Sequence, residues 1–160
     1  MLAISPTNGG FGFVVFEGPE RLIDWGLKTA RTTTGAKRLK LAPELFERYT
    51  PDALVIEDLA EKGSRRGRKA SELLVRIARL SSQTNVETVR ISRSAIKGAF
   101  AQFNSTTKYQ IAATIAARLP ELAPRLPKPR KPWMSEDSRM SIFDAAALAL
   151  TFLSGQTEST

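Results

Sequence analysis

Short apolar runs separated by turn residues dominate the first third of the chain. Apolar and aromatic residues occupy positions 2–4 and 11–16, and the intervening Pro6-Thr7-Asn8-Gly9-Gly10 favours a turn within an otherwise extended segment. After a Gly-Pro turn, residues 22–27 are again apolar and aromatic. We therefore predict antiparallel hairpins here, with residues 28–34 continuing the last strand or starting another.

Helix-like and strand-like patterns alternate in the middle of the chain. Leucine and phenylalanine positions fit a helix over about 37–49, and a following proline ends it. A continuous apolar run predicts a buried strand over 53–57. Apolar residues at helical spacing predict an amphipathic helix over about 67–83, and alternating apolar residues predict a last strand over 86–91.

The segment after this strand favours helices and then a linker. A short helix and a loop fit residues 92–103, and a longer helix fits 107–119, with Thr106 or Thr107 as its N-cap. Residues 120–132 contain five prolines and four basic residues. Such a composition disfavours helix and strand, and it predicts a solvated linker.

A last helix is expected over 136–153, with Ser135 as its N-cap and residues 154–160 as a frayed tail. Residues 1–153 would then form one domain, since the whole chain has 160 residues. The order of elements predicts an α/β fold with a mixed sheet, antiparallel early and parallel later, with helices on its faces.

The charge balance points to anionic partners. Lys and Arg number 24 against 16 Asp and Glu, which gives a formal net charge of +8. Nucleic acid is the first candidate partner and an anionic membrane surface the second. No apolar run approaches the ~18 residues of a membrane-spanning helix, and no signal-peptide pattern opens the chain. We therefore expect a cytoplasmic protein.

The absence of two residue types excludes several kinds of chemistry. The chain has no Cys and no His. Disulfides, thiolate zinc sites and histidine-dependent catalytic triads are therefore excluded. Any metal ion must be held by oxygen ligands, which favours magnesium, manganese or calcium.

Two acids stand at positions where a ligand site is expected. Glu57 ends the predicted buried strand, and ligands of α/β sheets bind at the carboxyl ends of strands. Asp144 lies in the last predicted helix beside an apolar run, where an acid is costly without a partner. Taken singly, each also fits an ordinary surface acid. Asp58, on the other side of its strand, and Asp24, at the far end of the hairpin, are weaker candidates.

Several segments together resemble RuvC-type Holliday junction resolvases, within the ribonuclease H-like nucleases. Residues 2–7 and 12–15 are similar to the opening hairpin of this family, and residues 54–57 to its apolar strand ending in the second acid. Residues 143–149 are similar to its terminal Ala- and Asp-rich helix. Lys97 and Lys108 fall where the family carries two lysines near the scissile phosphate. The resemblance covers about residues 2–153 and implies a ribonuclease H-like mixed five-stranded sheet flanked by helices.

The resemblance also implies a chemistry. In this family, carboxylates from the first strand, the fourth strand and the last helix hold two Mg²⁺ ions, for which Mn²⁺ substitutes, and these ions drive phosphodiester hydrolysis. Glu57 and Asp144 would be the corresponding metal ligands, and Lys97 and Lys108 would stabilise charge near the phosphate. Family members are homodimers acting on four-way junctions. The dimer would form through the 67–83 helix, whose Arg76 and Arg79 face also fits solvent.

Two positions depart from the family pattern. The first acid of the family corresponds to Ser5, and its other helix acid corresponds to Ser141. A serine hydroxyl is a neutral ligand and a poor bridge between divalent ions. Asp137, two turns before Asp144, would lie on nearly the same helix face and supply a third metal ligand. An acid in the first turn of a helix also fits the helix dipole without any metal.

Basic residues supply candidate contacts to nucleic acid. Residues 62–69 hold five cations in eight residues. They fit either a solvated loop or phosphate contacts that position DNA without reading its sequence. The candidate contact residues are Arg65, Arg66, Arg68 and Lys69, with Lys97 and Lys108 at the site itself, and more weakly Lys128, Arg130 and Lys131. Trp133 fits either a base-stacking residue or an exposed packing anchor.

Three functions follow from these patterns. The first is a structure-selective endonuclease that resolves four-way DNA junctions with Mg²⁺. The second is a catalytically inactive or weakened branched-DNA-binding protein of the same fold, which the serines at positions 5 and 141 would explain. The third is a nuclease of the same superfamily that acts on RNA or RNA–DNA hybrids.

Overall fold

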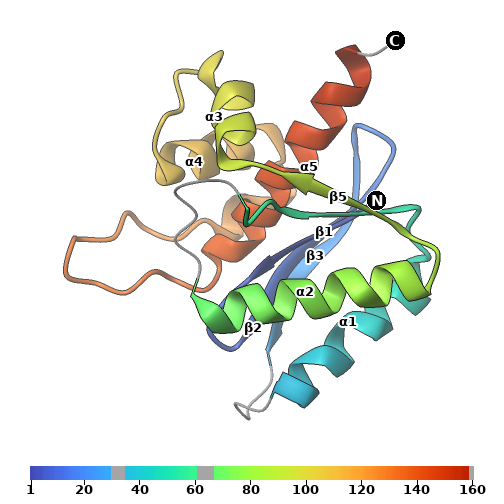
Figure 1. The fold of residues 1–160 in the computed structure, drawn as a ribbon. Helices are drawn as coiled ribbons and strands as arrows, with labels where there is room; N and C mark the ends of the chain where they lie inside the picture. The colour runs from blue at the N-terminus through green and yellow to red at the C-terminus, as the bar shows by residue number, and fades with distance from the viewer. Residues whose placement is uncertain (30–34, 61–66, 159–160) are drawn as a thin grey trace.

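The computed structural model describes residues 1–29, 35–60 and 67–158, and for 35–40 and 157–158 it describes the backbone alone. A five-stranded sheet runs through the centre of the molecule (Figure 1). Its strands are β1 (Leu2–Pro6), β2 (Gly10–Glu17), β3 (Arg21–Thr29), β4 (Ala53–Glu57) and β5 (Glu87–Ile91).

The strand order is β3-β2-β1-β4-β5. β1 pairs antiparallel with β2, and β2 pairs antiparallel with β3. β4 pairs parallel with β1 and with β5. The predicted mixed sheet, antiparallel early and parallel later, is confirmed, and it has the topology of the ribonuclease H-like fold.

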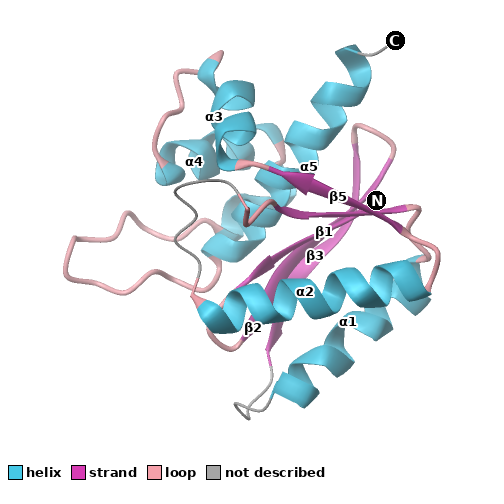
Figure 2. Cartoon of the chain, viewed as in Figure 1, coloured by secondary structure: helices cyan, strands magenta, loops and turns pink. Residues whose placement is uncertain are grey.

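Helices cover both faces of the sheet (Figure 2). One face carries α1 (Gly35–Tyr49) and α2 (Arg68–Gln83). The other carries α3 (Arg93–Ala101), α4 (Lys108–Arg118) and α5 (Met140–Glu158). Alternation along β1 explains the two layers, because Leu2 and Ile4 face α1 and α2 while Ala3 faces α5.

The aromatic residues of the hairpin pack into the core. Phe11, Phe13 and Phe16 are buried in the two core layers, and Trp25 is partly buried against one of them. The expected continuation beyond residue 27 ends at Thr29 in β3, and residues 30–34 lie outside the described part of the chain.

The N-cap of α4 is confirmed in detail. Thr107 accepts a hydrogen bond from the Gln110 backbone N–H, and the Gln110 side chain accepts one from the Thr107 backbone N–H. This reciprocal pair satisfies two donors that the helix start leaves unpaired. The first turn of α4 is therefore well fixed, and it carries Lys108.

The predicted solvated linker over 120–132 is wrong in its first half. Residues Pro120–Arg125 form a short 3-10 helix, and the Leu122 side chain is fully buried against α4 and α5. Pro120 fits here because the first turn of a helix needs no N–H from it. One apolar side chain is enough to dock the segment on the core.

The start and end of the last helix also differ from the prediction. α5 begins at Met140 rather than at 136, so Ser135 is not its cap and Asp137 precedes the helix. The backbone N–H of Met140 donates to the Asp137 carbonyl, which closes a turn before the helix starts. At the other end the helix continues to Glu158, beyond the expected end at 153. Within the described part of the chain, no helix has the length and apolar character needed to cross a membrane.

Candidate active site

Strand register brings two of the candidate residues to the same level of the sheet. Leu2 and Ala3 of β1 pair with Leu54 and Val55 of the parallel strand β4. Continued by two residues, this register sets Ser5 beside Glu57, on the face that carries α5. Both residues are buried, with Ser5 fully inaccessible and Glu57 5% exposed.

Close packing of α5 on β2 positions Asp144. A Cβ built on Gly12 would lie 2.5 Å from the Ser141 carbonyl carbon and 2.6 Å from the Ile142 nitrogen. Only glycine therefore allows the first turn of α5 to approach the sheet this closely. Ser141 donates a hydrogen bond to the Ser138 carbonyl at 2.7 Å, and Asp144 follows one turn later.

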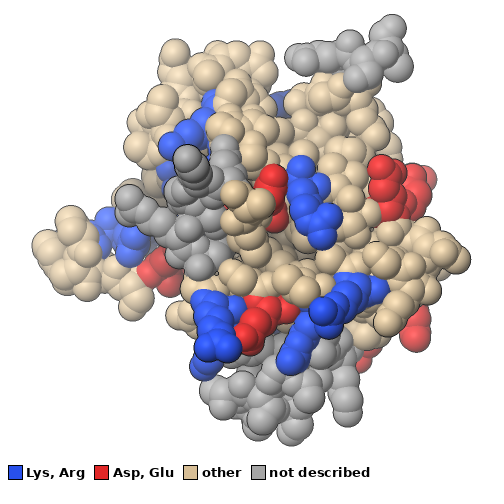
Figure 3. All heavy atoms as spheres, in the orientation of Figure 1, with Lys and Arg blue, Asp and Glu red and all other residues tan. Residues whose placement is uncertain are grey.

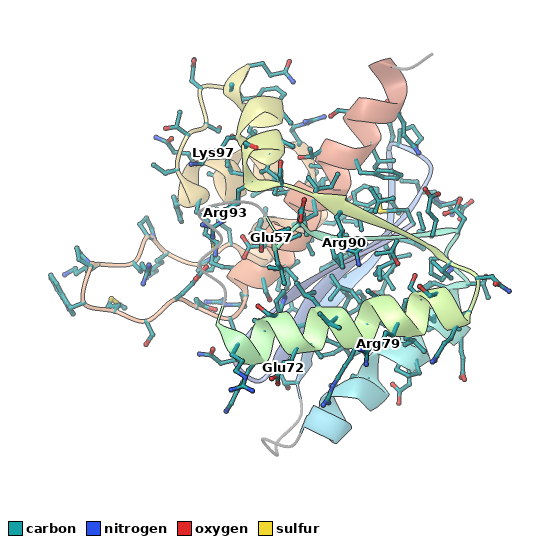
Figure 4. All side chains as sticks on the ribbon, in the orientation of Figure 1. Glu57, Glu72, Arg79, Arg90, Arg93 and Lys97 are labelled. Atoms are coloured by element: carbon teal, nitrogen blue, oxygen red, sulfur yellow. The ribbon has the colours of Figure 1, made fainter. Side chains whose placement is uncertain are left out.

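A cavity of about 280 Å³ unites the main candidates. Its wall includes Glu57 from β4, Lys97 from α3, Lys108 from α4 and Asp144 from α5. Figure 4 shows Glu57 at the end of its strand with Arg93 and Lys97 beyond it on α3. The fold thus gathers charged residues from four separate segments, two carboxylates and two predicted lysines among them.

Both carboxylates of this cavity face cations of the chain. Arg93 Nε lies 3.3 Å from Glu57 Oε1, and Lys108 Nζ lies 3.1 Å from Asp144 Oδ2. Lys108 also forms an ion pair with Glu136, which precedes α5. Sequence reasoning missed Arg93 and Glu136, because their partners lie on other elements. Ser92, which caps α3 by accepting from Ala95, fixes the turn that carries Arg93.

Asp137 is not on the α5 helix, so the argument from helix faces was wrong. It lines a second cavity of about 430 Å³, together with Asp144, Glu136 and Lys108. The Asp137 carboxylate accepts hydrogen bonds from the Arg139 guanidinium at 2.7 Å and from the Arg139 backbone N–H at 2.9 Å. The bond from the Arg139 guanidinium has the larger effect and the bond from the backbone N–H the smaller, and both hold the pKa of Asp137 below its ordinary value.

The two weaker acids serve local structure. Asp58 accepts a hydrogen bond from the Ala60 backbone N–H at 3.0 Å, just after β4. Asp24 accepts one from the Tyr49 hydroxyl and thereby links β3 to α1. Burial, followed by this contact with Asp24, raises the pKa of Tyr49.

The donor set suits one divalent ion better than two. In residues 1–29, 35–60 and 67–158, no three acidic side chains gather closely enough to hold a metal ion together. Glu57 and Asp144 share a cavity, and Mg²⁺ is commonly held by one or two carboxylates plus substrate phosphates. Ser5 adds only a neutral oxygen at the position that the family resemblance assigns to an acid.

The predicted phosphate contacts divide into two groups. Arg65 and Arg66 lie outside the described residues. Arg68 and Lys69, at the start of α2, are exposed, and Arg68 pairs with Glu72 at 3.1 Å. On the face seen in Figure 3, basic and acidic side chains of this kind interleave over α2.

The helix expected to form the dimer presents a mixed outer surface. Arg76, Arg79 and the apolar Val75 all lie exposed on α2. Figure 4 shows Glu72 and Arg79 along this outer side. Such a surface fits either solvent or a subunit contact, so the dimer stays a prediction.

Comparison with known proteins places the fold. No protein-family model and no curated protein sequence matches the chain. Among solved structures, the chain is similar to RuvC of Thermus thermophilus, with a TM-score of 0.66 and 19% identity over 99% of this chain and 97% of that one. It is also similar to the same protein in complex with Holliday junction substrate (TM-score 0.65, 19% identity, 98% and 96% covered). The yeast mitochondrial Holliday junction resolvase matches at a TM-score of 0.61 and 12% identity, over 98% of this chain and 78% of that one. The chain therefore has, across its whole length, the ribonuclease H-like fold of RuvC-type Holliday junction resolvases.

Proposed function

We propose that the chain binds four-way DNA junctions as a homodimer and nicks them in a reaction that depends on Mg²⁺ or Mn²⁺. The observation that carries this proposal is the single cavity shared by Glu57 and Asp144 with Lys97 and Lys108. Two carboxylates for a divalent ion and two ammonium groups for a phosphate are the components that phosphodiester hydrolysis needs. The net charge of +8 supports an anionic substrate.

Each group has a distinct role in this proposal. Glu57 and Asp144 would hold one divalent ion, which supplies Lewis-acid polarisation of a phosphoryl oxygen when bound. Lys97, exposed on α3 at the cavity, stabilises negative charge on the phosphate. Lys108 exchanges its contact with Asp144 for the phosphate and stays close to Glu136. Arg93 pairs with the buried Glu57 and orients its carboxylate toward the cavity.

A second function has specific support: junction binding without cleavage. Ser5 is buried where the resemblance expects an acid, and both cavity carboxylates already have cationic partners. A protein with these features keeps the binding surface and loses the site for a second ion. The two functions share the substrate and differ only in chemistry, so one assay separates them.

The test is a gel assay on an end-labelled four-way junction with Mg²⁺, with Mn²⁺ and with EDTA. We expect junction binding in all three and paired nicks only with a divalent ion. Glu57→Gln and Asp144→Asn should each reduce nicking at least ~100-fold while leaving junction binding within about twofold. Glu20→Gln, at an exposed acid in the turn between β2 and β3, is the matched control and should nick normally.

The other outcomes are equally informative. Tight junction binding with no nicks in either metal would favour the binding protein. Binding to junctions no tighter than to linear duplex would refute both functions. A preference for an RNA–DNA hybrid in competition would favour the third hypothesis. Sedimentation equilibrium tests the dimer separately, since a dimer has twice the mass of the 17.6 kDa chain.

A further inference from the structure

A proline-rich loop between the 3-10 helix and α5 protrudes from the body of the molecule, seen in orange at the left of Figure 1. Residues 128–136 are all exposed. Trp133 is 78% exposed, the largest exposure of any large apolar side chain in the described residues, and the neighbouring Met134 is 50% exposed. Tryptophan is enriched at binding interfaces, so an exposed indole beside an exposed methionine at a loop tip is a candidate contact surface.

The tip of this loop is an ordered turn. The Met134 backbone N–H donates to the Lys131 carbonyl at 2.9 Å, and the Arg130 guanidinium donates to the Met134 carbonyl at 2.9 Å. Lys131 Nζ lies 5.4 Å from the centre of the Trp133 ring, on one of its faces. The indole is therefore held away from the core and already oriented, which reduces the entropy lost on binding.

The loop returns to the candidate active site. Glu136 forms an ion pair with Lys108, and Asp137 is held by Arg139. Both acids, with Asp144, line the 430 Å³ cavity beside the site. A molecule held by the loop tip would thus be held at a fixed offset from the catalytic cavity.

The charge of the loop selects the kind of partner. Lys128, Arg130 and Lys131 precede Trp133, and residues 126–135 contain no acid. Cations interleaved with an exposed aromatic ring are the usual components of a surface that stacks nucleic-acid bases and neutralises their phosphates. Because Lys131 covers one face of the indole, the other face is left to receive a base.

We propose that Trp133 stacks on a base that is unstacked at the branch point of the bound junction, with Lys128, Arg130 and Lys131 on the adjoining phosphates. This inference rests on the proposed function and adds the residue that recognises the branch. A continuous duplex offers an indole no free base face along its length, whereas a branch point interrupts the stack. Trp133 therefore contributes to junction affinity and not to duplex affinity.

The first test compares variants at the loop tip by fluorescence anisotropy on a labelled four-way junction and on linear duplex. Trp133→Ala should weaken junction binding about 5- to 150-fold, and duplex binding about twofold or less. Trp133→Phe keeps an aromatic face and should retain most of the junction affinity. Ile23→Ala, which removes an exposed apolar side chain from β3, is the control and should change neither. Both positions are exposed, so folding is expected to survive each of the three changes.

The second test reports the contact itself. In a Trp25→Phe background, Trp133 is the one remaining tryptophan, and its emission should be quenched by the junction and not by duplex. Junction binding that is unchanged by Trp133→Ala would overturn this inference and leave the proposed function standing. Equal losses on junction and duplex would also overturn it. A wild-type protein that does not prefer junctions would refute the proposed function first. Emission that responds to anionic vesicles and not to DNA would identify a membrane-binding loop instead.

Discussion

Restoring an acid at position 5 tests the geometry of the site directly. The register of β1 and β4 sets Ser5 beside Glu57, and both are buried on the α5 side of the sheet. Ser5→Asp therefore introduces a second buried carboxylate next to Glu57, which already pairs with Arg93. Without a divalent ion we expect a loss of several kcal/mol of stability, because an uncompensated buried charge costs that much.

A divalent ion should reverse this loss. An ion present at 100 times its dissociation constant stabilises the folded state by about 2.7 kcal/mol. For a chain of this size that corresponds to a rise of roughly 5–10 °C in Tm. The asparagine of Ser5→Asn has nearly the same shape as aspartate and no charge. This variant should therefore lose stability through crowding alone and be stabilised little by Mg²⁺.

The assay is thermal unfolding of the wild type, Ser5→Asp and Ser5→Asn, each with Mg²⁺ and with EDTA. Equal responses of the two variants to Mg²⁺ would show that an acid at position 5 does not bind the ion. Ser5→Asp combined with Glu57→Gln covers the case in which the single variant does not fold. The double variant removes the repulsion between the two carboxylates and should recover stability in EDTA.

Three further results are expected from the geometry. The contact with the Arg139 guanidinium lowers the pKa of Asp137. The ionised carboxylate therefore stabilises the fold above the ordinary Asp pKa of about 3.9, and this stabilisation is lost as the pH falls through the lowered pKa. The Tm difference between the wild type and Asp137→Asn should decrease over the same fall in pH. Leu122→Ala should cost about 2–5 kcal/mol in urea unfolding, whereas a solvated linker would lose under about 0.5. Gly12→Ala should lower the free energy of unfolding by more than ~1–3 kcal/mol, because the new Cβ meets the Ser141 backbone. Gly98→Ala, in open space within α3, should raise it by about 0.5–1 kcal/mol. Similar values for the two variants would contradict the close approach of α5 to the sheet.

Local sequence patterns were sufficient for most of the fold. The strand over 53–57 and the helix over 67–83 lie within a residue of their predicted bounds, because apolar periodicity directly reflects which side faces the core. The prediction of a solvated linker over 120–132 was wrong because it depended on composition and not on periodicity. The composition of this segment is that of a linker, but the burial of Leu122 is a tertiary contact that composition does not encode.

The start of α5 shows how a local pattern misleads. Ser135 followed by two acids has the features of an N-cap and first turn, yet α5 begins only at Met140. Asp137 lies in the turn before the helix, where its carboxylate accepts from the Arg139 N–H. A shift of a few residues in the helix start was enough to misplace Asp137 relative to Asp144.

The sequence was enough to select the two acids and two lysines of the candidate site. It did not predict which ion pairs these residues form within the chain. Glu57 and Asp144 each have chemistry that stands out in sequence, since a buried strand end and a helix acid need partners. Arg93, the partner of Glu57, and Glu136, which pairs with Lys108, come from segments whose spacing carries no such signal. Only the folded structure shows that both carboxylates of the cavity already pair with basic side chains of the chain.

This pairing has a consequence for how an ion would be held. The 280 Å³ cavity carries three cations, Arg93, Lys97 and Lys108, against the carboxylates of Glu57 and Asp144. A divalent ion entering it must displace an ammonium or guanidinium group, so its affinity in the free protein should be low. A DNA phosphate both supplies oxygen ligands and gives Lys108 a new partner. Ion and DNA should therefore bind with positive linkage, and each should raise the affinity for the other by the same factor in calorimetric titrations.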